Sequence, residues 1–167
     1  MNENKNNIVL IGMPGVGKSI IGVILAKVIG YKFIDTDILI QEKCGDLLSQ
    51  IIKDNGIDKF IGIENEVNAN IKVENTVIAT GGSVIYGVEA MKNLKNIGKI
   101  VYLKQDFDRI NERVSNINGR GVVLKENQTF LDLYNERTSL YEKYADITIE
   151  EGDLTIEETL ESILNKI

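Results

Sequence analysis

The sequence predicts an α/β protein, a three-layer, doubly wound fold in which helices cover both faces of a five-stranded parallel sheet. Five short apolar segments alternate along the chain with stretches whose apolar residues recur at helical spacing. A glycine-rich turn directly follows the first of these segments and precedes the first helical stretch. Because neighbouring parallel strands need a crossover connection, the alternation of strands and helices favours a parallel sheet.

Each expected element has its own local signal. The first strand, 8–11, is apolar and ends at the glycine-rich turn, and the helix after it spans Lys18–Ile29. The other expected strands are 32–34, 76–79, 99–103 and 146–149. In the last segment Thr155 and Glu158 have the form of a capping box, and the closing helix that it predicts carries Ile156, Leu160, Ile163 and Leu164 on one face.

Length and composition exclude several classes of protein. With 167 residues, 43% of them hydrophobic, the chain can bury one good core, and we expect a single domain over residues 1–167. There is no histidine, which excludes histidine-based catalysis and histidine metal sites, and the single cysteine, Cys44, cannot form an internal disulfide.

The charge and hydropathy of the chain bear on its partners. The net charge is −6, which argues against a basic face for nucleic acid. No segment approaches the roughly 20 apolar residues of a membrane span. We therefore expect a cytoplasmic monomer that acts on a small molecule, with no nucleic-acid or membrane partner.

The turn after the first strand has the spacing of a phosphate-binding loop. Residues 12–19 read GMPGVGKS, which is Gly, four residues, then Gly-Lys-Ser, between a strand and a helix. Glycines let backbone N–H groups turn toward a β-phosphate, and the positive end of the helix points to the same place. Lys18 would approach the β- and γ-phosphates, and the Ser19 hydroxyl is a ligand for Mg²⁺. The motif predicts a site for ATP and Mg²⁺ formed by Gly12, Gly15, Val16, Gly17, Lys18, Ser19 and Ile20.

Two carboxylates follow the second expected strand. Asp35 and Asp37 stand where a doubly wound sheet binds its ligands, at the carboxyl end of a strand. One can reach the Mg²⁺ shell while the other orients an acceptor hydroxyl for attack. The alternative is that one of them only caps a helix beginning near Ile38. The phosphate-binding loop beside them favours the first interpretation.

Arginine is used sparingly, whereas lysine is the ordinary surface cation. The four arginines are Arg109, Arg113, Arg120 and Arg137. A guanidinium holds carboxylate or phosphate with two parallel hydrogen bonds, which lysine does not. Arg109 has Asp106 and Glu112 at helical spacing, so we expect it to form a surface ion pair. Arg137 and Arg113 have no acid at that spacing and are candidates for ligand binding, although a tertiary partner is an alternative for Arg113.

These motifs resemble the shikimate kinase family, small P-loop kinases built like the nucleoside monophosphate kinases, over nearly the whole chain. Besides the phosphate-binding loop, the resemblance includes FIDTD at 33–37, ATGGS at 79–83 and ERTSLYEKYAD at 136–146. The last segment follows the family pattern of Arg, two residues, Leu-Tyr and then Ala-Asp. The resemblance implies an ATP- and Mg²⁺-dependent kinase that converts shikimate to shikimate 3-phosphate in aromatic amino acid biosynthesis.

For the nucleotide, the resemblance implies that Lys18 and Ser19 hold phosphate and Mg²⁺ and that Asp35 lies near the metal. Arg113 would lie against adenine. Arg120, in a mobile lid over about 115–127, would close on the transferring phosphate.

For the acceptor, the resemblance implies that Asp37 binds the hydroxyls and Arg137 the carboxylate. Gly81 and Gly82 would let backbone amides approach the acceptor closely. Phe60 belongs to the acceptor-binding segment, over about 36–64. The catalytic residues implied are Lys18, Asp37 and Arg120.

The acceptor-binding segment departs from the family pattern, which is Gly-Glu, two residues, Phe-Arg, two residues, Glu. Gly56, Phe60 and Glu64 match this pattern, but Ile57 replaces the acid and Ile61 the arginine. Losing such a charged hydrogen bond costs about 2 to 5 kcal/mol of binding. Lys53 or Lys59 could replace the guanidinium only as a point charge. Two further departures are Ser83 at the third glycine of a triple-glycine turn and Arg-Gly-Val-Val at 120–123 for Arg-Pro-Leu-Leu.

These departures leave the acceptor open. Homoserine or a sugar acid is an alternative to shikimate, and a relative that binds ATP without transferring phosphate is another. A GTP switch is disfavoured because the sequence has no Asn-Lys-x-Asp guanine signature.

Overall fold

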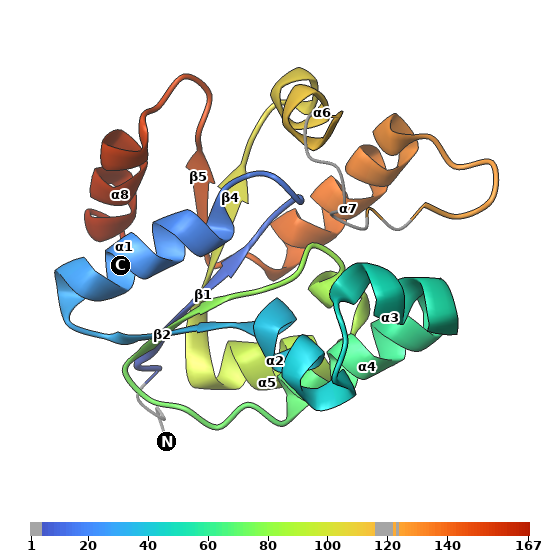
Figure 1. The fold of residues 1–167 in the computed structure, drawn as a ribbon. Helices are drawn as coiled ribbons and strands as arrows, with labels where there is room; N and C mark the ends of the chain where they lie inside the picture. Colours follow the sequence, from blue (N-terminus) through green and yellow to red (C-terminus); the bar gives the residue numbers. More distant parts are fainter. Residues whose placement is uncertain (1–4, 116–121, 123) are drawn as a thin grey trace.

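A parallel five-stranded sheet forms the centre of the protein in a computed structural model that describes residues 5–115, 122 and 124–167 (Figure 1). Its strands are β1 (Asn7–Ile11), β2 (Lys32–Asp35), β3 (Thr76–Ala79), β4 (Gly98–Lys104) and β5 (Ile147–Glu150). They lie in the order β2-β3-β1-β4-β5, and every neighbouring pair is parallel. All five expected strands are confirmed, with ends that differ by at most one residue, a normal uncertainty for strand ends.

Helices connect the strands. They are α1 (Lys18–Ile29), α2 (Thr36–Cys44), α3 (Leu48–Asn55), α4 (Ile57–Ala69), the 3₁₀ turn η1 (Val84–Tyr86), α5 (Val88–Ile97), α6 (Phe107–Ser115), α7 (Phe130–Tyr144) and α8 (Ile156–Leu164). The bounds expected for α1 are confirmed, and so is the capping box of Thr155 and Glu158 at α8. Helix α2 begins at Thr36, earlier than expected, because Asp35 accepts a hydrogen bond from the N–H of Asp37 and caps it.

The helices cover both faces of the sheet, as the doubly wound, three-layer prediction requires. Along β1, successive side chains point to opposite faces. Ile8 and Leu10 pack in one core with α1 and α8, whereas Val9 and Ile11 pack in the other with α5 and α7 (Figure 1). A third, small cluster of Ile40, Ile51 and Phe60 holds α2, α3 and α4 together beside the sheet.

The topology places the three segments that follow β1, β2 and β3 at one edge of the sheet, beyond the carboxyl ends of these parallel strands. Strand β1 lies between β3 and β4, so the connections from β1 and from β3 leave toward opposite sides of the sheet. Ligands of doubly wound sheets bind at this reversal, beyond the carboxyl ends of the strands. The segment after β3 is tied to β1 there, because the N–H and hydroxyl of Thr80 both donate to the carbonyl of Leu10. In the described part of the chain no helix is long and apolar enough to cross a membrane.

Candidate functional site

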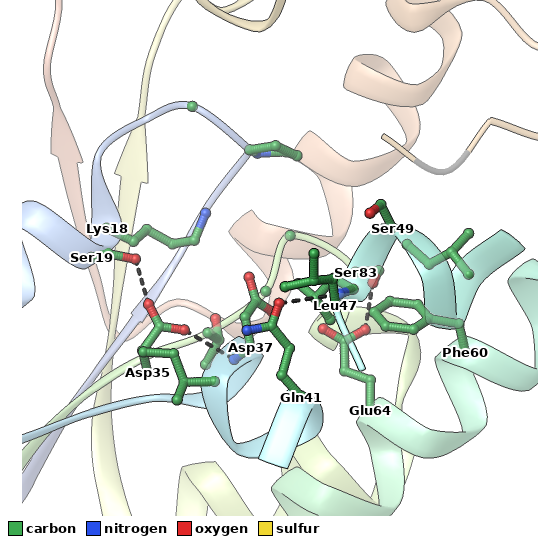
Figure 2. A pocket seen from close by; sticks show the side chains of 18 of the residues that line it. Lys18, Ser19, Asp35, Asp37, Gln41, Leu47, Ser49, Phe60, Glu64 and Ser83 are labelled. Carbon is green, nitrogen blue, oxygen red and sulfur yellow. Dashed lines mark hydrogen bonds between the residues drawn. The ribbon is translucent and has the colours of Figure 1, made fainter. Parts of the chain in front are cut away.

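A pocket of about 710 Å³ opens where these loops meet (Figure 2). In Figure 2, Lys18, Ser19 and Asp35 lie on one side of the pocket, with Phe60, Glu64 and Ser83 across from them and Asp37 between the two groups. The predicted site residues that line it are Gly15, Gly17, Lys18, Ser19, Ile20, Asp35, Asp37, Phe60, Gly81, Gly82, Arg113 and Arg137. The sheet thus brings together residues that are far apart in the sequence.

Three predicted site residues are not in this lining. Gly12 lies at the base of the phosphate-binding loop, and Val16 is buried and faces a smaller cavity nearby. Arg120 and most of the predicted lid lie outside the residues that the structure describes.

The phosphate-binding loop has the backbone conformation that its glycines permit. Gly12, Gly15 and Gly17 have φ values of 149°, 80° and 101°, a region that L side chains rarely adopt. A methyl group on Gly12 would also lie 2.6 Å from the carbonyl oxygen of Leu103 in β4. The Nζ of Lys18 donates to the carbonyls of Gly12 and Met13, at 2.8 and 2.9 Å, and so lies inside the loop. The N-terminus of α1 opens onto the same place, which makes this loop a candidate anion site.

Ser19 and Asp35 place two side-chain oxygens next to each other, both of a kind that binds Mg²⁺. The Ser19 hydroxyl donates to Asp35 Oδ2 at 2.6 Å, while Asp35 Oδ1 accepts from the N–H of Asp37 at 2.9 Å. Asp35 therefore caps α2 and still presents an oxygen to the pocket, so capping and ligand binding are compatible here. Mg²⁺ prefers oxygen ligands and is commonly bound by one or two carboxylates with substrate phosphates and waters. The pair fits such an ion, and the described residues contain no cluster of three His, Cys, Asp or Glu that could bind a metal unaided.

Two glycines after β3 allow charged side chains to approach the backbone. A methyl group on Gly81 would lie 2.8 Å from Asp37 Oδ1 and closer still to Glu64 Oε1. On Gly82 it would lie 2.9 Å from Pro14 Cδ and 3.0 Å from Arg137 Nη1. Both carboxylates and the guanidinium therefore converge on this short turn, which needs glycine for its close contacts.

Arg137 is buried, with 2% of its surface exposed, although it carries a charge. Its guanidinium lies 5.5 Å from the centre of the Tyr86 ring, a cation–π distance. Its Nε is buried and has no hydrogen-bond partner among the described residues. The expectation that Arg137 does not form a surface ion pair is confirmed, and the residue lines the pocket.

The other two described arginines differ from each other. Arg113 Nη1 donates to the carbonyl of Gly15 at 3.3 Å, so this side chain lies against the phosphate-binding loop. Arg109 forms an exposed ion pair, as expected, but with Asp153 instead of the acids expected from helical spacing. The sequence could not indicate this partner, because the turn after β5 brings Asp153 to α6 from a distant part of the chain.

Glu64 lines the pocket and was matched in the sequence without being given a role. Only 1% of its surface is exposed. Burial raises its pKa from 4.5 to about 7 and the Asp37 carboxylate adds to this, while the Ser83 hydroxyl, Arg137 and Lys18 act in the opposite direction. Ser83 donates a short hydrogen bond to Glu64 Oε2. Its Oε1 has no hydrogen-bond partner within the described ranges. The match of Glu64 to the family pattern was the signal that could have marked it.

The two isoleucines that replace charged residues of the family pattern, Ile57 and Ile61, are absent from this pocket lining, whereas Ser83, a third departure, lines it. Ile57 and Ile61 are half-buried elsewhere on α4, and the exposed Lys53 and Lys59 do not line the pocket either. On the side of the pocket formed by α2, α3 and α4, the described lining residues include Ile38, Gln41, Leu47, Leu48, Ser49, Ile52 and Phe60. Among the described residues, Arg137 is therefore the one guanidinium that lines the acceptor side of the pocket.

Comparisons with known proteins point to the family that the sequence motifs resemble. The family model for shikimate kinase matches residues 14–167. A shikimate kinase from Clostridium botulinum (strain Eklund 17B / Type B) is 38% identical over 160 residues, which covers 95% of each chain. The solved structure of a shikimate kinase from Acinetobacter baumannii in complex with shikimate superimposes with a TM-score of 0.88 at 31% identity. That match covers 99% of this chain and 97% of the other.

More distant likeness extends to a gluconokinase from Sinorhizobium meliloti 1021. Its TM-score is 0.56 at 16% identity, over 96% of this chain and 93% of the other, and this shows a shared fold only. The family model and the 38% identity, in contrast, both extend over nearly the whole sequence. This chain therefore belongs to the shikimate kinase family.

Proposed function

We propose that the protein is a shikimate kinase, which transfers the γ-phosphoryl group of ATP to the 3-hydroxyl of shikimate and releases shikimate 3-phosphate and ADP. The observation that carries the proposal is one pocket in which the phosphate-binding loop faces a carboxylate, Asp37, and a buried guanidinium, Arg137. Phosphoryl transfer depends mainly on positioning and on neutralising oxygen charge, and these residue types supply both.

On the nucleotide side, the backbone N–H groups of the loop and the N-terminus of α1 bind the β-phosphate. Lys18, which lies inside the loop, places its charge beside the β- and γ-phosphates. Ser19 and Asp35 would hold Mg²⁺, which would supply positive charge to neutralise the phosphate oxygens. Arg120 would add a further positive charge from the lid over about residues 115–127.

On the acceptor side, Arg137 pairs with the carboxylate and Asp37 accepts a hydrogen bond from the hydroxyl that attacks. The hydroxyl oxygen forms the new bond to the γ-phosphorus as the bond to the β-γ bridging oxygen breaks, and its proton passes toward Asp37 or solvent. Phe60, from the acceptor-binding segment of about 36–64, supplies an apolar wall. Gly81 and Gly82 let Asp37 and Arg137 lie close to the turn, and would let its backbone amides approach the acceptor.

A second candidate is a kinase of the same type with another hydroxy acid as its acceptor. The observation that favours it is the acceptor side itself, where Arg137 is the lone guanidinium among the described lining residues and Ile61 replaces the family's second arginine. One guanidinium would hold the shikimate carboxylate less tightly than two.

The test is ADP release from Mg·ATP, measured separately with shikimate, homoserine and gluconate, with the phosphorylated product identified by mass spectrometry. Turnover with shikimate and little with the other two acceptors is the expected result. Turnover with homoserine or gluconate, and none with shikimate, would mean that the acceptor is not shikimate. ADP binding without turnover on any of them would indicate a non-catalytic relative.

We further propose that the enzyme works in the cytoplasm as a monomer, with a small-molecule acceptor and no nucleic-acid partner. Light scattering after size exclusion should then give a mass near 18.6 kDa. A mass near twice that value would indicate a dimer.

A further inference from the structure

A second cavity, of about 270 Å³, lies beside the phosphate-binding loop. It shares Gly15, Gly17, Ile20 and Arg113 with the main pocket but none of the acceptor-side residues. A nucleotide whose phosphates occupy the loop, with its γ-phosphate toward the acceptor, can extend its other end into this cavity. Apolar walls suit a flat heteroaromatic ring, and these are formed by Val16, Ile21, Leu154 and Ile156.

Glu151 lines this cavity and is held in place by its backbone. It follows β5 directly, its N–H donates to the carbonyl of Lys104 at 2.8 Å, and its own carbonyl accepts from the N–H of Leu154 at 2.7 Å. The turn that it begins contains Gly152, whose φ is +45° and whose carbonyl accepts from Gln105 Nε2 at 3.1 Å. Glu151 is therefore fixed at the carboxyl ends of β4 and β5, the edge of the sheet where ligands bind.

The carboxyl group of Glu151 is buried, and one of its two oxygens is unpaired within the described residues. Only 5% of the residue is exposed, and Oε2 has no hydrogen-bond partner in the part of the chain that the structure describes. Burial raises its pKa from 4.5 to about 7, and the positive charges of Arg113 and Lys18 oppose this only in part. Leaving a buried polar atom unpaired costs stability, and such atoms call for an explanation such as a ligand.

We propose that Glu151 recognises the base of the nucleotide, with its carboxyl accepting a hydrogen bond from the exocyclic amino group of adenine. The proposal rests on the proposed function, because the phosphate-binding loop and its nucleotide place the base in this cavity. In either protonation state one carboxyl oxygen accepts a hydrogen bond. Above its pKa the carboxylate can only accept hydrogen bonds, so a base with a carbonyl oxygen at the same position would set one acceptor against another, whereas the protonated carboxyl could donate to that carbonyl. The planar guanidinium of Arg113, at the rim of the same cavity, can stack on the face of the ring.

Inosine diphosphate (IDP) is the sharpest probe. It differs from ADP in only two places: a carbonyl replaces the exocyclic amino group, and the neighbouring ring nitrogen carries a hydrogen. Dissociation constants for ADP and IDP, both with Mg²⁺, are measured by calorimetry at pH 8, where Glu151 is mostly ionised, for the wild type, Glu151→Gln and a control, Glu150→Gln. The control removes a carboxylate one residue away that is exposed and paired with Lys104. A ratio of two ligands on one preparation does not depend on the fraction of folded protein.

We expect the wild type and Glu150→Gln to bind ADP at least about tenfold tighter than IDP. In Glu151→Gln the ratio should fall to about threefold or less, because the amide can also donate to the carbonyl of IDP. An unchanged ratio in Glu151→Gln, or equal weakening of both ligands, would overturn the assignment while leaving the kinase proposal intact. No ADP binding by the wild type would overturn both.

Discussion

Replacing Glu64 with glutamine should change how the stability of the protein depends on pH. Glu64 is buried, and its folded-state pKa of about 7 lies above its ordinary value of 4.5. Between these values the folded protein holds a proton that the unfolded chain has released. The stability contributed by the protonated carboxyl is therefore fully present below pH 4.5 and is lost as the pH rises through about 7. Glutamine has no proton to release, so the variant does not suffer this loss.

The size of the effect follows from the pKa shift. One pKa unit corresponds to about 1.4 kcal/mol, so the full loss is about 3 kcal/mol of the free energy of unfolding. About 2 kcal/mol of it falls above pH 5.5, a range that stays clear of the sequence isoelectric point near 4.8. For a chain of this length 1 kcal/mol corresponds to roughly 2 to 4 °C in Tm. The Tm of Glu64→Gln relative to the wild type should therefore rise by about 4 to 8 °C between pH 5.5 and 8.5.

Thermal unfolding, followed by circular dichroism at half-unit pH steps, measures this difference. Glu151 titrates in the same range but is present in both proteins, so the subtraction removes its contribution. A matched control is Glu66→Gln on the same helix, because the Glu66 side chain is 63% exposed and pairs with Lys43 at the surface. Its curve should remain parallel to that of the wild type.

Two results would refute the reasoning on Glu64. Parallel pH curves for the wild type and Glu64→Gln would mean that the folded protein does not hold the extra proton. A relative Tm that falls as the pH rises would mean that the Ser83 hydroxyl and Arg137 stabilise the charged form by more than burial opposes it.

Three further substitutions separate the roles within the pocket. Asp37→Asn should lower kcat about 10²- to 10⁴-fold and change the Kd for ADP less than twofold, and equal losses in both would make Asp37 a binding residue. Arg137→Lys should raise the KM for shikimate at least about tenfold and leave the KM for ATP unchanged, because a point charge replaces a planar fork. Unchanged kinetics with shikimate would refute its pairing with the carboxylate. Gly82→Ala should cost about 1 to 3 kcal/mol of stability, measured by urea unfolding, since the added methyl group meets the ring of Pro14; a loss below about 0.5 kcal/mol would mean that the turn relaxes.

The sequence predicted most accurately those features whose signal lies within one short segment of the chain. Strand positions, helix α1 and the capping box of Thr155 depend on the order and spacing of nearby residues, and the structure confirms them. The glycine-lysine-serine loop belongs to the same class, because its spacing is directly readable. The sheet then brings Asp35 and Asp37 beside this loop, which the order of strands and loops had indicated.

Contacts between distant segments could not be read in the same way. The Ser83 hydroxyl reaches Glu64 from the turn after β3, and both side chains had only been compared with a family pattern. The exposed pair of Arg109 and Asp153 joins α6 to the turn after β5. These partners depend on how helices and turns pack, and no pattern within one segment encodes that packing. The roles of the site residues in binding and turnover stay predictions.

The unsatisfied atoms on the acceptor side have a consequence for inhibitor design. Glu64 Oε1 and Arg137 Nε are both buried without partners among the described residues, and they belong to the same pocket. A compound that offers a hydrogen-bond donor to the first and an acceptor to the second would satisfy both at once. Compounds that depend on a second guanidinium, in contrast, would lose affinity here, because Ile61 stands at that position in this chain. The acceptor side therefore offers selectivity between this protein and relatives that keep both arginines.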